Sequence, residues 1–132
     1  MKLILALACD EARLRDDGKL DVIGIFNELG APGFPASHDR MTVVFVIEWT
    51  AAELGSQPLR ADLIDQDDQL VLTIQGRTDV DRRSPDQPPA HTRVVLPLEN
   101  VVFPHPGAYR FRLMAGASTV DALPLFVATR PQ

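Results

Sequence analysis

The chain has 132 residues, 45% of them hydrophobic, which is enough to bury the core of one domain. Its 13 lysines and arginines against 18 aspartates and glutamates give a formal net charge of -5, which excludes a general attraction to nucleic acid or anionic membranes. Cys9 is the only cysteine, so no intramolecular disulfide forms, and no segment approaches the ~18 apolar residues of a membrane span. We expect one cytoplasmic domain over residues 1–132, without a cofactor.

Apolar residues alternate with period two along most of the chain, as in strands with one buried face. In chain order, the expected strands cover residues 3–8, 20–27, 41–49, 59–63, 70–74, 92–98, 109–113 and 120–127. The first apolar run is only six residues long, which is shorter than the roughly 7 to 15 residues of a secretory signal. These eight short strands predict an all-β fold, a single antiparallel β-sandwich.

The connections between these strands are mostly turns. Residues 16–19 and 114–118 contain glycine where a tight turn favours positive φ, and residues 65–69 resemble a polar hairpin loop. The Thr-x-x-Glu spacing of Thr50 and Glu53 is typical of a capping box and predicts one helical turn. A second brief helical turn is expected at residues 10–15, after a first strand that ends at Cys9.

Prolines indicate where the sheets are interrupted. Residues 30–35 are expected to form an irregular but ordered loop, whereas residues 79–90 are polar and proline-rich and are expected to be flexible. Pro97 and Pro124 each lie inside a late strand. Because proline cannot donate a ladder hydrogen bond, both strands should be edge strands or contain bulges there.

Two strands are apolar on both faces. Ile23 and Ile25 lie opposite the apolar face of their strand, and Val44 and Val46 do so in the next long strand. A sandwich buries one face of each sheet, so these residues require another cover, either the chain's own loops or a second subunit. We expect them to form an interface with a protein partner or a second copy.

Catalytic and metal-binding patterns are weak. The carboxylates next to Cys9 oppose thiolate formation, so we expect a structural thiol. The three histidines lack the spacing of zinc ligands, and His105, between two prolines, resembles an exposed loop residue. Calcium is the remaining metal candidate, because β-sandwich loops can gather carboxylates. The candidate ligands are Asp10, Glu11, Asp16, Asp17, Asp65, Asp67 and Asp68.

Enzymatic activity has no local signature here. Neither a Gly-x-Ser-x-Gly elbow nor a phosphate-binding glycine pattern occurs. We expect a non-enzymatic sandwich that acts through protein contacts, by self-association or as an accessory subunit. The alternatives are a loop-end module for calcium or a small polar ligand, and a hydrolase whose paired carboxylates meet only in space.

Several segments together resemble a known family. They are "GKLDVIGIFNEL", "APGFP", the valine-rich strand, "TAAELG", "LRADLIDQDDQ" and "FPHPGAYRFRLMAGASTVDALPLFV". The chain resembles a family of small bacterial proteins known only as a domain of unknown function, least closely over residues 77–90. The last segment is also similar to the closing hairpin of immunoglobulin-like sandwiches. The resemblance implies a compact β-sandwich and supplies no catalytic residue.

Overall fold

A computed structural model describes residues 1–130; the last two residues of the expected domain lie outside this range. Nine strands form two sheets, and the described residues include no helix, hence none that could span a membrane. The first sheet has the order β2-β1-β4-β7, with β1 (Lys2–Leu14), β2 (Leu20–Phe26), β4 (Ala36–Glu48) and β7 (His91–Phe103). All its neighbouring strands are antiparallel.

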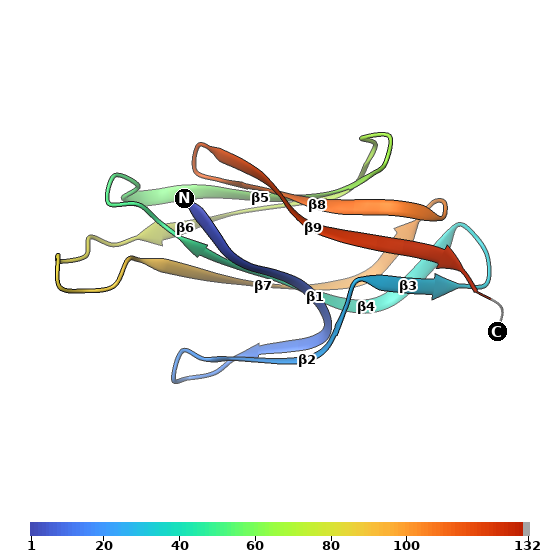
Figure 1. The fold of residues 1–132 in the computed structure, drawn as a ribbon, viewed down its shortest axis with the longest axis horizontal. Helices are drawn as coiled ribbons and strands as arrows, with labels where there is room; N and C mark the ends of the chain where they lie inside the picture. Colours follow the sequence, from blue (N-terminus) through green and yellow to red (C-terminus); the bar gives the residue numbers. More distant parts are fainter. Residues whose placement is uncertain (131–132) are drawn as a thin grey trace.

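The second sheet has the order β3-β9-β8-β5-β6. Its strands are β3 (Glu28–Ala31), β5 (Gly55–Asp65), β6 (Leu70–Val80), β8 (Gly107–Ala115) and β9 (Ser118–Thr129). β3 runs parallel to β9, and the other neighbours are antiparallel. Figure 1 shows the two sheets as layers, with β5, β8 and β9 in one and β1, β4 and β7 in the other. The prediction of an all-β sandwich is therefore confirmed.

The main core lies between the two sheets and follows the alternation of the sequence. The inward side chains of β4, such as Met41 and Phe45, and Trp49 directly after this strand pack against inward residues of the opposite sheet such as Leu63 and Phe111. Each is nearly or fully inaccessible to solvent. Burying a side chain of this size stabilises the fold by about 1.5–3 kcal/mol. The eight predicted strands are all present, because one-face burial imposes the period of two that identified them.

Three expectations about local structure are wrong. β1 continues to Leu14, so Cys9 lies inside the strand and residues 10–15 form no helical turn. Thr50 and Glu53 form a turn in which the Glu53 carboxylate accepts a hydrogen bond from the Thr50 amide at 3.0 Å, but no helix follows. Residues 30 and 31 of the expected irregular loop belong to β3, which is a strand in addition to the eight expected.

The prolines lie where a strand lacks a partner on one side. Pro97 is in β7, an edge strand. Pro124 is in β9, which pairs with β3 only from Phe126 to Thr129, so β9 has a free edge at Pro124. The predicted flexible segment is shorter than expected, since residues 79 and 80 end β6. The remaining loop, residues 81–90, contains a turn from Ser84 to Gln87, and its flexibility stays a prediction.

Candidate functional site

The second half of β1 and most of β2 form a hairpin arm, defined here as residues 10–25. In Figure 1, β1 bends near its middle and turns back, so that the arm projects below the first sheet. Gly24 lies at this bend with a φ of +71°, and a Cβ added there would overlap the Asp10 carboxylate. A residue with a side chain would therefore suffer both backbone strain and a clash. Glycine permits the bend that brings the arm against the sheet.

The arm covers the outer face of the first sheet. Leu7, Cys9 and Val44 form a second buried cluster on this face, and Ala12, Leu20 and Val22 of the arm pack against it. Val44 is fully buried and Val46 is only 8% exposed. The prediction that Val44 and Val46 form an interface is therefore wrong. The chain itself supplies the cover that their second apolar face requires.

The other two predicted interface residues are exposed. Ile23 and Ile25 on the arm have 61% and 66% of their surface accessible. Three of the nine exposed large hydrophobic residues among residues 1–130 lie within the 16 residues of the arm: Leu14, Ile23 and Ile25. β2 is also an edge strand, so one row of its backbone groups is free to pair. The arm thus combines exposed apolar side chains with an open strand edge.

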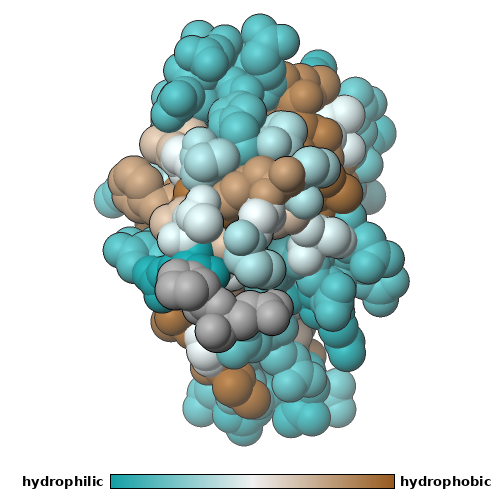
Figure 2. Space-filling model, turned by 90° about the vertical axis from the view of Figure 1, so that its right-hand side faces the viewer, coloured by the Kyte–Doolittle hydropathy of each residue, from teal (hydrophilic) through white to brown (hydrophobic). Residues whose placement is uncertain are grey.

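The opposite end of the molecule differs from the arm. Figure 2 views the end that holds the C terminus, where hydrophobic residues appear as separate patches among hydrophilic ones. Single exposed apolar residues of this kind are normal on soluble proteins. This end therefore offers no continuous apolar surface in that view.

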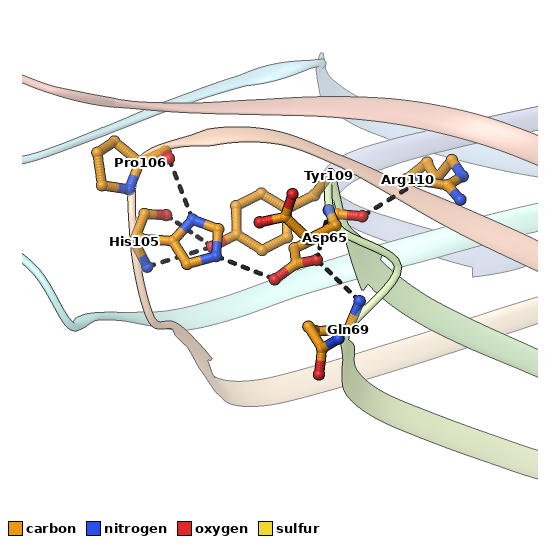
Figure 3. A network of polar contacts seen from close by, with 7 residues as sticks. Asp65, Gln69, His105, Pro106, Tyr109 and Arg110 are labelled. Carbon is orange, nitrogen blue, oxygen red and sulfur yellow. Dashed lines mark hydrogen bonds and ion pairs between the residues drawn. The ribbon is translucent and has the colours of Figure 1, made fainter.

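A polar network ties the β5–β6 turn to the β7–β8 loop at this end (Figure 3). The buried carboxylate of Asp65 accepts hydrogen bonds from the amides of Asp67 and Gln69, both at 2.8 Å. It also lies 3.0 Å from Nε2 of His105. The hydrogen bond from Gln69, helped by those from His105 and Asp67, lowers the pKa of Asp65 although burial opposes this. Asp65 therefore stabilises the turn as an anion.

His105 is held on both sides of its ring. Nε2 faces Asp65, and Nδ1 lies 3.1 Å from the carbonyl oxygen of Pro106. The ring stacks on Tyr109 with centroids 5.6 Å apart. The hydrogen bond to Asp65 and that to Pro106 raise the pKa of His105. The interpretation of His105 as a plain exposed loop residue is wrong, because it links two loops distant in sequence.

Tyr109 completes the network. Its hydroxyl donates a hydrogen bond to the carbonyl oxygen of His105, four residues earlier, at 2.6 Å. This is the geometry of a tyrosine corner, which fixes the start of a strand in many β-sandwiches. Both ring nitrogens of His105 have partners within the chain, so neither is directed toward a substrate. The arrangement stabilises two loops and does not resemble a nucleophile–base pair.

The acidic residues considered for calcium do not assemble. Asp16 and Asp17 lie at the tip of the arm, while Asp65, Asp67 and Asp68 lie in the β5–β6 turn at the opposite side of Figure 1. Within residues 1–130, no three His, Cys, Asp or Glu side chains are placed to hold a metal ion. The calcium alternative therefore stays a prediction without geometric support.

Local partners account for several of these carboxylates. Asp17 accepts a hydrogen bond from the Lys19 amide at 3.1 Å and pairs with Arg15 at 2.8 Å. Asp68 pairs with Arg110. Asp10 and Glu11 lie in β1, with Asp10 beside Gly24. These contacts explain Asp17 and Asp68 as parts of turns and surface ion pairs, whose contribution to stability is small.

Cys9 is fully buried, and its Sγ lies 3.5 Å from the carbonyl oxygen of Thr42. Burial, followed by the charge of Asp10, raises the pKa of its thiol. A buried thiol with a raised pKa is a poor nucleophile. The geometry agrees with the expected structural role, at the middle of β1 rather than at its end.

The comparisons with known proteins identify a family but no activity. No curated protein and no solved structure matches the chain. Residues 4–128 match the family described as "Family of unknown function (DUF6941)", which agrees with the resemblance found in the sequence. The chain belongs to this family, whose function is not known.

Proposed function

We propose that this protein is a non-enzymatic interaction module whose contact surface is the hairpin arm. The observation behind the proposal is the exposure of Ile23 and Ile25 on an arm that packs on the sheet through three other apolar residues, Ala12, Leu20 and Val22. Burying a large aliphatic side chain is worth about 1.5–3 kcal/mol. Two isoleucines beside each other therefore supply a substantial part of the free energy that a weak contact requires.

The contact we propose is with a second copy of the chain. A two-fold contact requires a patch that is complementary to itself, and a pair of isoleucines meets this condition. The free edge of β2 adds unpaired backbone groups to the same region. Two of the three other edges are less suited to pairing. β3 has only four residues, and β7 contains Pro97.

We also propose that the sandwich is immunoglobulin-like. β1, β4 and β7 in one sheet and β5, β8 and β9 in the other follow the order of strands A-B-E and C-F-G of that fold. The hydrogen bond of Tyr109 to the backbone is a second point of similarity. With this assignment of strands, the hairpin arm has no counterpart among the strands of the immunoglobulin fold. Additions to a shared framework are frequent sites of function, which favours the arm as the contact surface.

A cytoplasmic location fits this proposal. Cys9 is free and buried, and nothing in the described residues depends on oxidation. The net charge of -5 disfavours nucleic acid and anionic membranes as partners, which leaves proteins as the expected class.

Sedimentation velocity over a wide concentration range tests the proposal. The Ile23→Asp/Ile25→Asp double variant places two charges on the arm, so we expect it to remain folded and to lose any concentration-dependent association of the parent protein. Leu70→Asp is the matched control, because Leu70 is 53% exposed but lies at the start of β6. This control should associate like the parent.

Two results would contradict the proposal. In the first, Leu70→Asp disrupts association as strongly as the double variant does. In the second, the parent protein stays monomeric at every concentration tested.

A further inference from the structure

β6 is an edge strand without the usual protection against pairing. It runs from Leu70 to Val80 with no proline, and no strand among residues 1–130 pairs with its outer side. Gln75, Gly76 and Arg77 in its middle are all exposed. Natural edge strands are usually short, interrupted by proline or covered, because an open edge pairs with other chains. The β6 edge is therefore suited to receive an added strand.

The backbone groups of Arg77 face the open side of β6. Arg77 lies opposite Pro58 of β5. The Pro58 carbonyl oxygen accepts a hydrogen bond at 2.9 Å from the amide of Gly116, which directly follows β8 on the side of β5 away from β6. Pro58 and Arg77 are therefore a non-hydrogen-bonded pair, in which the N–H and C=O groups of both residues point away from each other. Arg77 thus has one donor and one acceptor free for a strand beside β6.

An apolar crevice opens next to this edge, between the two sheets. β6 and β7 are edge strands of different sheets that lie close to each other across the gap between the layers (Figure 1). Between them is a cavity of about 200 Å³ with an almost entirely apolar lining, which includes Leu59, Ile74, Val94 and Leu96. An apolar cavity of about 150 Å³ accommodates one benzene molecule. The crevice therefore has room for one large apolar side chain, such as that of phenylalanine.

Gly76 leaves the entrance to the crevice open. It lies opposite Leu59, which packs on the core, and opposed residues share a face, so position 76 faces between the sheets. A Cβ built on Gly76 meets nothing within 4 Å. A strand added to β6 would place the residue opposite Gly76 on this same inward face. Its side chain can then lie over the glycine and enter the crevice.

Arg77 carries a positive charge on the opposite, outer face of β6, because successive side chains of a strand alternate. There it donates a hydrogen bond to the Ser56 hydroxyl at 2.8 Å. On the same face Arg60, Arg110 and Arg112 each pair with an aspartate. Arg77 pairs with no carboxylate among residues 1–130. An acidic residue on an added strand, opposite Arg77, would supply the missing partner.

We propose that the β6 edge binds an extended segment of a different protein as an added antiparallel strand. A large apolar side chain of this segment fills the crevice opposite Gly76, and an acidic side chain lies beside Arg77. Because the two strands run in opposite directions, the acidic residue directly precedes the apolar one in the partner's sequence. β6 itself has no acidic residue before Asp79, so a second copy supplies no such partner through the same edge. This surface is separate from the hairpin arm and stands or falls independently of the self-association proposed there.

A short peptide with the sequence Lys-Val-Glu-Phe-Thr-Val-Thr, blocked at both ends, tests this surface. With its glutamate opposite Arg77, its phenylalanine lies opposite Gly76. In an NMR titration we expect saturable shifts of the Arg77 amide signal and of the methyl signals of Ile74 and Val94. A control peptide with alanine in place of phenylalanine should bind about tenfold more weakly or worse, because it leaves the crevice empty.

Variants of the protein separate the two contacts. Gly76→Leu fills the crevice and should abolish binding, and the smaller Gly76→Ala should weaken it if the leucine variant does not fold. Arg77→Gln should weaken binding about twofold to fivefold. The matched control Arg93→Gln, an exposed arginine on β7, should not change it. Glutamine in place of the peptide's glutamate should weaken binding to the parent but not to Arg77→Gln.

The proposal is overturned if millimolar peptide moves none of these signals, or if it moves those of the hairpin arm instead. It is equally overturned if the alanine peptide binds as tightly as the phenylalanine peptide, or if both Gly76 variants fold and bind like the parent. Equal loss of binding in Arg77→Gln and Arg93→Gln would refute the charge pairing at Arg77.

Discussion

The cover that the hairpin arm places over Val44 has a measurable energetic consequence. Val44→Ala removes two methylene equivalents from a side chain with no exposed surface. At about 0.8 kcal/mol for each, the transfer term is about 1.6 kcal/mol, and the cavity left behind raises the expected loss to about 2–3 kcal/mol. Ile25→Ala removes more carbon atoms, but Ile25 is 66% exposed, so its loss should stay within about 0.5 kcal/mol.

Urea unfolding of the two variants and the parent, monitored by the fluorescence of the buried Trp49, measures both losses. The experiment should be performed at low protein concentration, so that association does not contribute to stability. A loss below about 0.5 kcal/mol for Val44→Ala would refute the reasoning, because it would mean that the arm does not keep water from this face. A loss for Ile25→Ala as large as that for Val44→Ala would refute it as well.

Three further predictions concern other parts of the chain. Gly24→Ala should lower the free energy of unfolding by about 1–3 kcal/mol in urea titrations, because the backbone at φ +71° is strained for alanine and its Cβ would meet Asp10. His105→Asn should destabilise the protein more near pH 5.5 than near pH 9. The raised pKa of His105 gives a contribution that is complete below about pH 6.5 and is lost as pH rises through the folded-state value. The lowered pKa of Asp65 gives a contribution to stability that is complete above about pH 3.9 and is lost only in more acidic solution, so it does not change between these two pH values. An equal loss of stability in His105→Asn at pH 5.5 and pH 9 would contradict the pairing of His105 with Asp65. Cys9 should react with a thiol reagent far more slowly in the native protein than in urea, and equal rates would exclude its burial in β1.

The strands could be predicted because burial on one face leaves a local pattern. The inward residues of β4 alternate with the others from Met41 to Ile47, and this alternation is visible without a structure. β3 was missed because Glu28–Ala31 is short and its pairing with β9 joins segments almost 100 residues apart. The second half of β1 was missed because its charged residues are typical of a turn, although in an arm they simply face solvent.

Contacts between segments that are distant in the sequence account for the remaining differences between the predictions and the structure. An apolar residue on the second face of a strand indicates that some cover exists, but the sequence does not say whether another chain or the same chain provides it. For Val44 the cover is the arm, whose bend depends on Gly24. The contact between Asp65 and His105 joins two turns 40 residues apart. The sequence contained two local signals for this contact, which were a tyrosine four residues after His105 and an aspartate at the start of a polar turn.

The central claim is that the exposed residues of the arm are the contact surface between two copies of the chain. A dilution series of amide NMR spectra tests this most directly, because it reports every backbone position in the unmodified protein. We predict that shifts or line broadening with rising concentration are confined to residues 10–14 and 20–26, with the largest effects at Ile23 and Ile25. Spectra that do not change with concentration, or changes centred on another edge such as β6, would contradict the claim.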